Sequence, residues 1–443
     1  MGGSVRIAIV GSGIGGLATA WLLHGRHEVT LFEAEPRPGG HSHTVDVHLP
    51  DRSLPVDTGF IVYNEHNYPG LTRLFAWLGV PTRWSDMSFA ASLEGGRFEY
   101  AGHSLGGLFG QPANLLRPRF LRLLLDIPRF NRAGRRFLAR TPDDPATVGE
   151  FVRRLRLGPG FVRGYLVPMA AAIWSAPPAS VLEMPAASLL RFFDNHRLLG
   201  IDGHHRWRTV VGGSRRYVAA MTAPLRGRLR LGAPVRVVRR VAGGVELVVD
   251  GQGVERFDRV VLACHADQAL AVLVDADPEE RAILGAIRYQ PNRAVLHRDP
   301  ALMPRRRRCW AAWNYLAPAG GDPTAPASVT YWMNRLQGLD TDEPILVSLN
   351  PPREPRAELV HGIFHWAHPI LDGPALRAQA AMPRIRGRGG VDYAGAWLGW
   401  GFHEDGLRSA IEAAAALGVR PPWETGAVAG ETVAAPMVGA RVA

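Results

Sequence analysis

The chain has 443 residues, 47% of them hydrophobic, and a formal net charge of +11 at pH 7. This length suits two or three globular domains, and no apolar run is long enough to cross a bilayer. All 51 Lys+Arg residues are arginine, which excludes Schiff-base chemistry, a P-loop lysine and a lysine general base. Two cysteines are too few for a disulfide framework or a thiolate cage, and we expect no metal site.

The first 33 residues predict a dinucleotide-binding βαβ unit. An apolar run, a glycine-rich turn, a helical stretch and a second apolar run follow one another at residues 5–10, 11–16, 17–23 and 29–32. The turn reads Gly11, Ser12, Gly13, Ile14, Gly15 and Gly16. Gly11 permits the tight turn, Gly13 lets the backbone approach a pyrophosphate, and Gly16 lets the helix pack closely. The helix N-terminus then faces the phosphates, and Glu33 is placed to accept hydrogen bonds from a ribose.

The next segment indicates which dinucleotide is bound. After Glu33 come Ala34, Arg37 and the run Gly39, Gly40, His41 and Ser42, followed later by Thr58 and Gly59. This resembles the R-x-G-G-R motif of the flavin amine oxidoreductase superfamily, which includes monoamine oxidases and phytoene desaturases. His41 stands where that family usually has its second arginine.

Two later segments carry the same resemblance in the same order. Residues 211–264 match the part of the family that forms the adenine-side wall, with Val235 and Ala263 at matching positions. Residues 393–409 look like the family's closing motif, which contains Gly395, Ala396, Gly406 and Leu407. Ala396 replaces the acid that is usual there. The resemblance therefore implies FAD as the cofactor, held by these residues and by those of the two earlier motifs.

The implied fold is α/β: a Rossmann-like FAD-binding domain of the GR2/amine-oxidase type with an inserted mixed α+β substrate domain. We expect residues 1–80, 208–265 and 390–420 to form the discontinuous FAD domain. Residues 81–207 and 266–389 would form the substrate and membrane-facing domain, and 421–443 a loose tail.

The substrate follows from a finer resemblance. The sequences of residues 172–178, 331–337 and 401–406 look like those of a bacterial branch of the superfamily. That branch is found with cyclopropane-fatty-acid-synthase-like methyltransferases and resembles flavin-dependent fatty-acyl desaturases. This implies an FAD-dependent oxidoreductase that desaturates acyl chains of membrane phospholipids. The missing lysine agrees, since many amine oxidases hold a water near the flavin with one. For catalysis the sequence offers Tyr63, Asn64 and Glu65, which follow the turn at Thr58 and Gly59.

Residues 117–140 alternate arginines with bulky apolar side chains at helical spacing. Such a helix suits an anionic membrane surface, and it equally suits a domain helix whose apolar face meets the core. No nucleic-acid-binding motif accompanies the charge, so we expect no nucleic acid partner. The N-terminus shows no signal peptide, which predicts a cytoplasmic protein, peripheral on the membrane if the helix docks there. The sequence does not indicate an oligomeric state.

Three alternatives stay open at this point. A soluble amine or amino-acid oxidase would use the same scaffold and should show an anionic or aromatic clamp near Trp397 and Trp400. A flavin-binding protein without catalysis would also fit. More remotely, Gly102-His103-Ser104-Leu105-Gly106 matches the G-x-S-x-G elbow of serine hydrolases, which requires a central strand before it and a helix after it.

Overall fold

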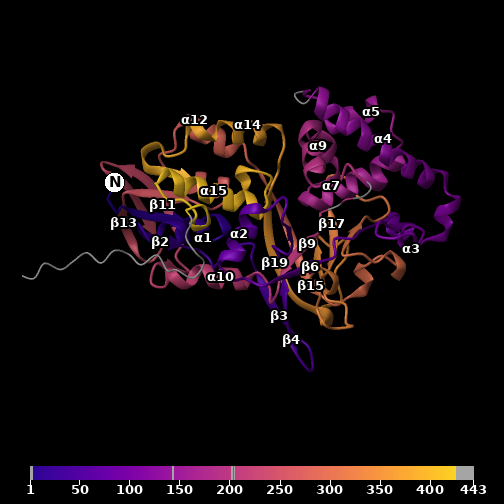
Figure 1. Ribbon diagram of the computed structural model, residues 1–443, viewed down its shortest axis with the longest axis horizontal. Helices are drawn as coiled ribbons and strands as arrows, with labels where there is room; N and C mark the ends of the chain where they lie inside the picture. Colours follow the sequence, from indigo (N-terminus) through magenta and orange to yellow (C-terminus); the bar gives the residue numbers. More distant parts are fainter. Residues whose placement is uncertain (1–2, 142–143, 201–202, 204, 426–443) are drawn as a thin grey trace, which may run out of the picture.

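The computed structural model describes residues 3–141, 144–200, 203 and 205–425. Figure 1 shows a dinucleotide-type α/β unit on the side of the N-terminus and a cluster of helices at the opposite end, with a large sheet between and below them. Within the described ranges, no helix is both long and apolar enough to span a membrane.

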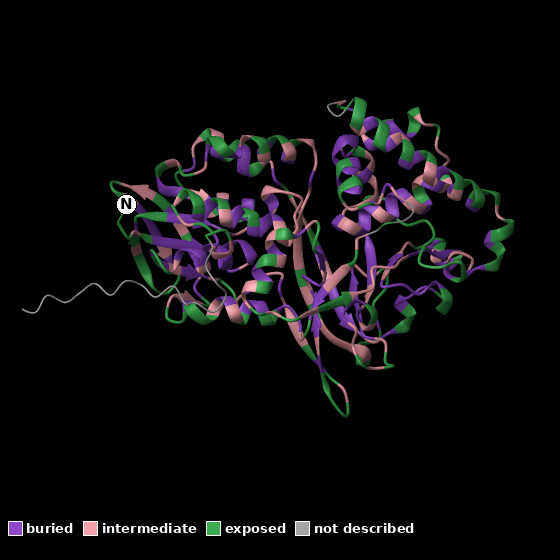
Figure 2. Ribbon diagram, viewed as in Figure 1, coloured by how far each residue is buried: buried purple, intermediate pink, exposed green. Residues whose placement is uncertain are grey.

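A five-stranded parallel sheet forms the core of the first unit, and its strands come from three separate stretches of chain. In spatial order they are β10 (Leu229–Arg230), β2 (Glu28–Phe32), β1 (Arg6–Val10), β14 (Arg259–Leu262) and β20 (Val391–Tyr393). Figure 2 colours this sheet largely as buried. Covering layers on both faces explain why its strands are continuous apolar runs and not alternating ones.

Helices cover one face of this sheet and a second sheet covers the other. α1 (Ile14–Leu23) packs against α15 (His403–Ala416), and both join a core that includes Leu17 and Ala410. The opposite core contains side chains from an antiparallel sheet. Its strands are β11 (Val235–Val241), β12 (Gly244–Val249) and β13 (Gly253–Phe257). The mixed α/β class with a Rossmann-like parallel core is thus confirmed.

A seven-stranded sheet forms the second unit, and all its neighbouring strands are antiparallel except β16 and β7. In spatial order the strands are β19 (Val360–Pro369), β15 (Tyr289–His297), β18 (Leu346–Leu349), β17 (Ser328–Trp332), β16 (Trp313–Leu316), β7 (Phe89–Leu93) and β8 (Phe98–Ala101). A helical layer shares one apolar core with it. Its helices are α4 (Pro118–Arg140), α5 (Val148–Arg154), α6 (Pro159–Phe161), α7 (Val167–Trp174), α8 (Pro178–Glu183) and α9 (Ala186–Asn195).

Short elements connect the two units. Two of them pair as the hairpin of β3 (Thr44–His48) and β4 (Ser53–Asp57), and three pair as a sheet of β5 (Tyr63–Asn64), β9 (Trp207–Val210) and β6 (Thr82–Ser85). The remaining helices are α2 (Pro69–Trp77), α3 (Leu105–Leu108), α10 (Arg215–Thr222), α11 (Ala266–Val272), α12 (Pro278–Gly285), α13 (Met333–Leu336) and α14 (Gly373–Ala381).

The boundary between the units differs from the predicted one after residue 265. The predicted substrate segment 266–389 contains α11, α12 and α14, yet these helices share a core with β11–β14. Of the predicted tail, residues 426–443 lie outside the described part of the chain. The described residue Trp423 stacks on Trp21 of α1, with 6.2 Å between the ring centroids.

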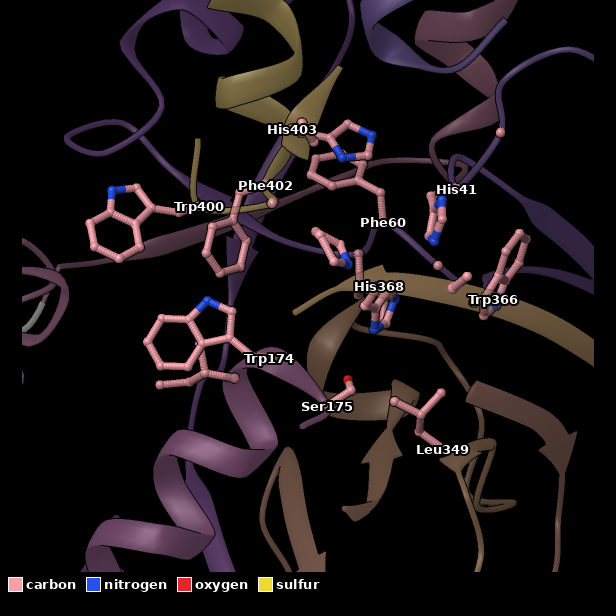
Figure 3. A pocket seen from close by; sticks show the side chains of 18 of the residues that line it. His41, Phe60, Trp174, Ser175, Leu349, Trp366, His368, Trp400, Phe402 and His403 are labelled. Carbon is pink, nitrogen blue, oxygen red and sulfur yellow. The ribbon is translucent and has the colours of Figure 1, made fainter. Parts of the chain in front are cut away.

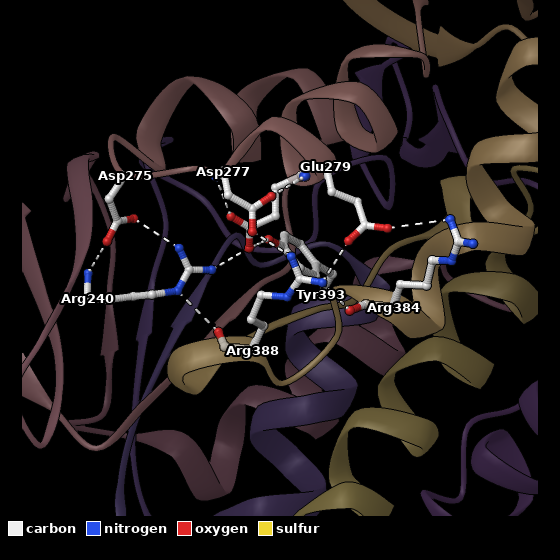
Figure 4. A network of polar contacts seen from close by, with 8 residues as sticks. Arg240, Asp275, Asp277, Glu279, Arg384, Arg388 and Tyr393 are labelled. Atoms are coloured by element: carbon white, nitrogen blue, oxygen red, sulfur yellow. Dashed lines mark hydrogen bonds and ion pairs between the residues drawn. The ribbon is translucent and has the colours of Figure 1, made fainter.

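An ion-pair network that includes the buried Glu280 attaches the segment before β20 to β11 and α12 (Figure 4). Arg240 of β11 contacts Asp275, with 3.1 Å between nitrogen and oxygen, and also the fully buried carboxylate of Glu280. Arg388 donates to Asp277 and, over 2.9 Å, to Glu279. These contacts hold the closing segment of the chain onto the parallel sheet.

We expect Glu280→Gln to lower the free energy of unfolding by about 2–3 kcal/mol, because the change leaves Arg240 without its buried counter-charge. The matched control is Glu279→Gln. Its side chain is 39% exposed, so its ion pairs should contribute less than about 1 kcal/mol. Urea denaturation of the two variants measures both values, and equal losses would contradict the assignment.

Candidate functional site

A single cavity of about 1960 Å³ runs from the carboxyl ends of the parallel strands to the helical layer. At one end it is lined by the loops after β1, β2 and β14, where open α/β sheets bind their ligands. At the other end it is lined by apolar side chains of α4 and α7 and by strands of the large sheet. One space therefore joins a nucleotide-type site to an apolar chamber.

The glycine turn after β1 is held in place by hydrogen bonds. The Gly11 N–H donates to the Phe32 carbonyl over 2.8 Å, and the Gly39 N–H donates to the Ser12 carbonyl over 3.0 Å. The Glu33 carboxylate accepts from the Ser12 N–H over 2.8 Å and from its hydroxyl. Glu33, predicted as a ribose acceptor, therefore also fixes the turn, and it lines the cavity while doing so.

Two glycines of this turn have opposite surroundings. A Cβ atom on Gly16 would lie 1.8 Å from the Gly11 carbonyl oxygen, so α1 packs directly on the turn. A Cβ atom on Gly13 would meet nothing within 4 Å, although Gly13 lines the cavity. The space beside Gly13 is thus left open by the protein, as close approach of a pyrophosphate requires.

The segment from Arg37 to His41 faces the same space. The Arg37 guanidinium donates to the Gly40 carbonyl over 3.0 Å, and its carbon lies 5.8 Å from the centre of the Trp366 ring. The His41 ring lies 4.8 Å from Trp366 and 5.4 Å from His368, centroid to centroid. Its Nε2 atom is buried and has no hydrogen-bond partner in the described structure. An unpartnered polar atom on the cavity wall fits a bound polar ligand.

His403, at the start of α15, connects three distant segments. Its ring stacks on Phe60 with 3.7 Å between centroids, and its Nε2 atom lies 2.9 Å from the Ser42 hydroxyl and 3.2 Å from the Tyr217 hydroxyl. The next residue, Glu404, accepts hydrogen bonds from the N–H groups of the first turn of α2. The predicted closing motif therefore fastens α15 to the other parts of the site.

Burial lowers the pKa values of several imidazoles around the cavity. Burial lowers the pKa of His368 to about 4 and that of His403 to about 3. Burial also lowers the pKa of His43 to about 4 and holds the pKa of His41 well below its ordinary value. These side chains present hydrogen-bonding groups without positive charge.

Aromatic side chains surround the middle of the cavity. In Figure 3, His41, Trp366 and His368 lie on one side, Phe60 and His403 on another, and Trp174, Trp400 and Phe402 on a third. Phe192 joins the third group, 4.6 Å from Trp174 and 5.6 Å from Phe402 between ring centroids. Beyond them the apolar chamber begins.

The structure brings most of the predicted cofactor residues to the cavity wall. Those that line it are Gly11, Ser12, Gly13, Ile14, Gly15, Glu33, Ala34, Arg37, Gly40, His41, Thr58, Gly59, Val235, Ala263, Gly395 and Ala396. The others lie behind this wall and pack its parts together: Gly16, Gly39, Ser42, Gly406 and Leu407.

The predicted catalytic residues do not line the cavity. Tyr63 packs edge-on against Phe75, Asn64 accepts from the Asn67 N–H, and Glu65 forms an ion pair with Arg208. All three belong to β5, which pairs with β9, or to the turn after it, and none of them is among the residues that line the cavity. This geometry does not support their predicted approach to the flavin.

The hydrolase elbow is also wrong. The strand before Ser104 is β8, which lies at the edge of the large sheet, whereas an elbow follows a central strand. The Ser104 hydroxyl accepts from the Gly107 N–H over 3.0 Å and thereby caps the four-residue α3.

Sequence reasoning missed several wall residues, among them Phe60, Trp366, His368, Phe402 and His403. Trp366 and His368 are two positions apart in β19 and therefore share one face of the strand. A search of the sequence for the period-2 pattern of strands could have found them. His403 stands inside the closing motif, and its contacts with Ser42 and Tyr217 depend on the folded chain.

We expect Gly13→Ala to fold normally and to bind FAD at least about tenfold more weakly, because the new methyl group enters only the open space beside the turn. Gly25→Ala is the matched control, since a Cβ atom there also meets nothing within 4 Å and Gly25 does not line the cavity. Circular dichroism checks the fold, and flavin titration of the stripped protein measures the affinity. Equal FAD affinities of the two variants would contradict this position of the pyrophosphate.

Stability should fall as the pH drops from 6.5 towards 4. In this range the imidazoles of His43, His368 and His403 bind protons in the unfolded chain but not in the folded protein, because burial lowers their pKa values below the ordinary value. Burial raises the pKa of Asp57 to about 6 and also raises the pKa values of Glu404 and Asp405, which acts in the opposite sense over part of this range, but the buried imidazoles with lowered pKa values outnumber these three carboxyls. Melting temperatures between pH 7.5 and 4.5 test this, and His403→Gln should make the slope shallower. A flat or rising profile would refute it.

Comparison with known proteins agrees with this geometry. The model of the flavin containing amine oxidoreductase family matches residues 14–297. Similar solved structures include a CLA-producing fatty acid isomerase from P. acnes, with a TM-score of 0.67, 16% identity and coverage of 93% of this chain and 98% of that one. Cyclohexylamine oxidase from Brevibacterium oxydans IH-35A has a TM-score of 0.67 and 18% identity, covering 94% of this chain and 98% of its own.

A putrescine oxidase bound to putrescine is similar as well, with a TM-score of 0.66, 16% identity and coverage of 94% and 99%. At these identities the likeness concerns the fold. The family uses FAD, and the open space at Gly13, the fixed turn and the Arg37 guanidinium fit that dinucleotide. The protein is therefore an FAD-dependent oxidoreductase, and the chain belongs to the flavin containing amine oxidoreductase family.

Proposed function

We propose that the protein dehydrogenates the acyl chains of phospholipids. The observation that carries this proposal is the apolar chamber at the far end of the cavity. Its lining includes Leu123, Leu124 and Ile127 of α4 and Met169 and Ile173 of α7. A long hydrocarbon chain gains free energy from burial against such walls, roughly 0.8 kcal/mol per methylene group.

The charge around the cavity also favours a neutral substrate. The carboxylates among the described lining residues are Glu33, Glu35 and Asp267, all at the nucleotide end. An ammonium group in the chamber would therefore lack a counter-charge, which costs several kcal/mol. One of the proteins with a similar fold carries the name of a fatty acid isomerase.

The reaction removes a hydride and a proton from adjacent carbons and leaves a double bond. Bound FAD supplies the two-electron acceptor for the hydride. The walls exclude water and hold the chain extended, and we assign the proton to a neutral imidazole of the His41 and His368 pair. These two rings lie 5.4 Å apart, and both line the cavity.

Amine oxidation remains a second candidate because of one observation. The aromatic group of Trp174, Phe192, Trp400 and Phe402 offers ring faces to a cation. Trp397 does not add to this group, since it is 2% exposed and its ring N–H donates to the Cys264 carbonyl over 3.1 Å.

Anaerobic mixing distinguishes the two candidates without requiring an electron acceptor. We expect a detergent-solubilised phospholipid to bleach the flavin absorbance in a single turnover, and a panel of primary amines to leave it unchanged. Bleaching by amines alone would reject the acyl substrate in favour of amine oxidation.

A variant tests the chamber itself. Ile173→Trp should fill part of it and slow bleaching by long-chain phospholipid at least about tenfold, with unchanged FAD content. Ile173→Val is the matched control and should change the rate less than about twofold. Equal rates for the two variants would show that the acyl chain does not occupy this chamber.

A further inference from the structure

Exposed leucines are concentrated in one stretch of the chain. Of the eleven large hydrophobic side chains exposed in the described residues, five fall between residues 105 and 125. We call them the leucine patch: Leu105, Leu115, Leu116, Leu121 and Leu125. Leu116 is 87% exposed, Leu105 77% and Leu125 65%. Exposed apolar side chains that cluster in this way are typical of interaction sites, whereas scattered single ones are ordinary.

The patch follows the chain from α3 through a 3₁₀ turn (Pro112–Leu116) into the first half of α4. This stretch lies at the end of the molecule far from the dinucleotide unit (Figure 1). The sequence pattern left open whether 117–140 faces a membrane or the core. The structure places its main apolar face in the core, through Phe120, Phe130 and Phe137. The exposed leucines are a separate face.

Exposed arginines extend the face of α4 that carries the leucines. Leu121 and Leu125 share a helical stripe with Arg132 and Arg136, at spacings of four, seven and four residues. Both arginines are exposed, and no ion pair involves them in the part of the chain that the structure describes. The whole helix carries seven arginines and one aspartate, and that aspartate is buried. Leucines followed by unneutralised arginines complement the acyl boundary and the phosphates of an anionic bilayer.

The helices that carry the patch also line the cavity. α3 places Leu105 outside and Leu108 on the cavity wall, and α4 places Leu121 outside and Leu124 on the wall. One helical turn therefore separates the outer patch from the apolar chamber. We propose that the leucine patch and the adjoining arginines dock on the surface of an anionic phospholipid membrane, so that an acyl chain enters the chamber between α3 and α4. The inference rests on the proposed function for what enters, but docking can be measured without turnover.

The test is sedimentation of the FAD-loaded protein with vesicles of phosphatidylcholine, with or without phosphatidylglycerol. The protein should bind the anionic vesicles, and Leu105→Ser/Leu116→Ser/Leu125→Ser should lower the partition coefficient at least tenfold. The matched control is Leu231→Ser/Val254→Ser/Val274→Ser. It removes three exposed apolar side chains elsewhere and should bind like the unaltered protein. Vesicle binding that is the same for both triple variants would overturn the proposal.

A charge variant separates electrostatic from apolar binding. Arg132→Gln/Arg136→Gln/Arg140→Gln should lose the preference for anionic vesicles and most of the salt dependence. Arg122 and Arg129 are left unchanged because they neutralise the buried carboxylate of Asp126. An unchanged preference for phosphatidylglycerol would contradict the assigned role of these arginines.

Three further outcomes complete the test. A protein that forms dimers which the triple serine variant abolishes, and that ignores vesicles, would assign the patch to self-association and refute membrane docking. Vesicle binding that depends on the patch, together with a flavin that no phospholipid bleaches, would support docking and reject the proposed function. Retained bleaching of the triple serine variant by detergent-solubilised lipid would confirm that its chemistry is intact.

Discussion

The site depends on backbone-to-backbone contact between stretches that lie hundreds of residues apart. A Cβ atom on Gly11 would lie 2.9 Å from the Ala263 carbonyl oxygen, and one on Gly15 would lie 3.3 Å from the Gly395 nitrogen. Side chains at these positions would push the start of α1 away from the two later stretches of the chain, and a side chain on Gly406 would separate it from the start of α15. Because two helix ends meet there, the nucleotide end of the cavity gains positive potential without requiring many charged side chains.

The hydrogen bonds of His403 complete this convergence. One ring joins the Ser42 loop, Tyr217 of α10 and the Phe60 segment, and a neutral imidazole does this without an uncompensated charge in a buried place. The Arg240 guanidinium acts further back, where it pairs with Glu280 and donates to the Arg388 carbonyl of the segment before β20. The His403 and Arg240 side chains thus link chain segments on either side of a large insertion. The insertions can therefore form a separate apolar chamber while these contacts hold the nucleotide end together.

Short sequence patterns predicted those segments whose conformation depends on residues close by in the sequence. The turn 11–16 was recognisable because its glycines, the flanking apolar runs and Glu33 all lie within one short unit. The surroundings of Tyr63, Asn64 and Glu65 could not be predicted locally, because they depend on pairing with β9, which is distant in the sequence. Glu65 and its partner Arg208, for example, are 143 positions apart. The same limit applies to α4. Its period revealed an apolar face, but the separate exposure of Leu121 and Leu125 follows only from which neighbours cover the helix.

Two residues of the cofactor wall, His41 and Ala396, stand where the resemblance led us to expect an arginine and an acid. His41 lies against Trp366 and His368, with a pKa that burial holds well below its ordinary value, and Ala396 lies close to Gly406. The nucleotide end of the described wall carries Arg37 and Arg236 together with the carboxylates of Glu33, Glu35 and Asp267, and the middle of the cavity is aromatic. The described lining of the apolar chamber has no carboxylate, so the chamber offers poor solvation to an ammonium group and no penalty to a hydrocarbon. This difference in polarity between the two ends is the physical basis of the proposed acyl substrate.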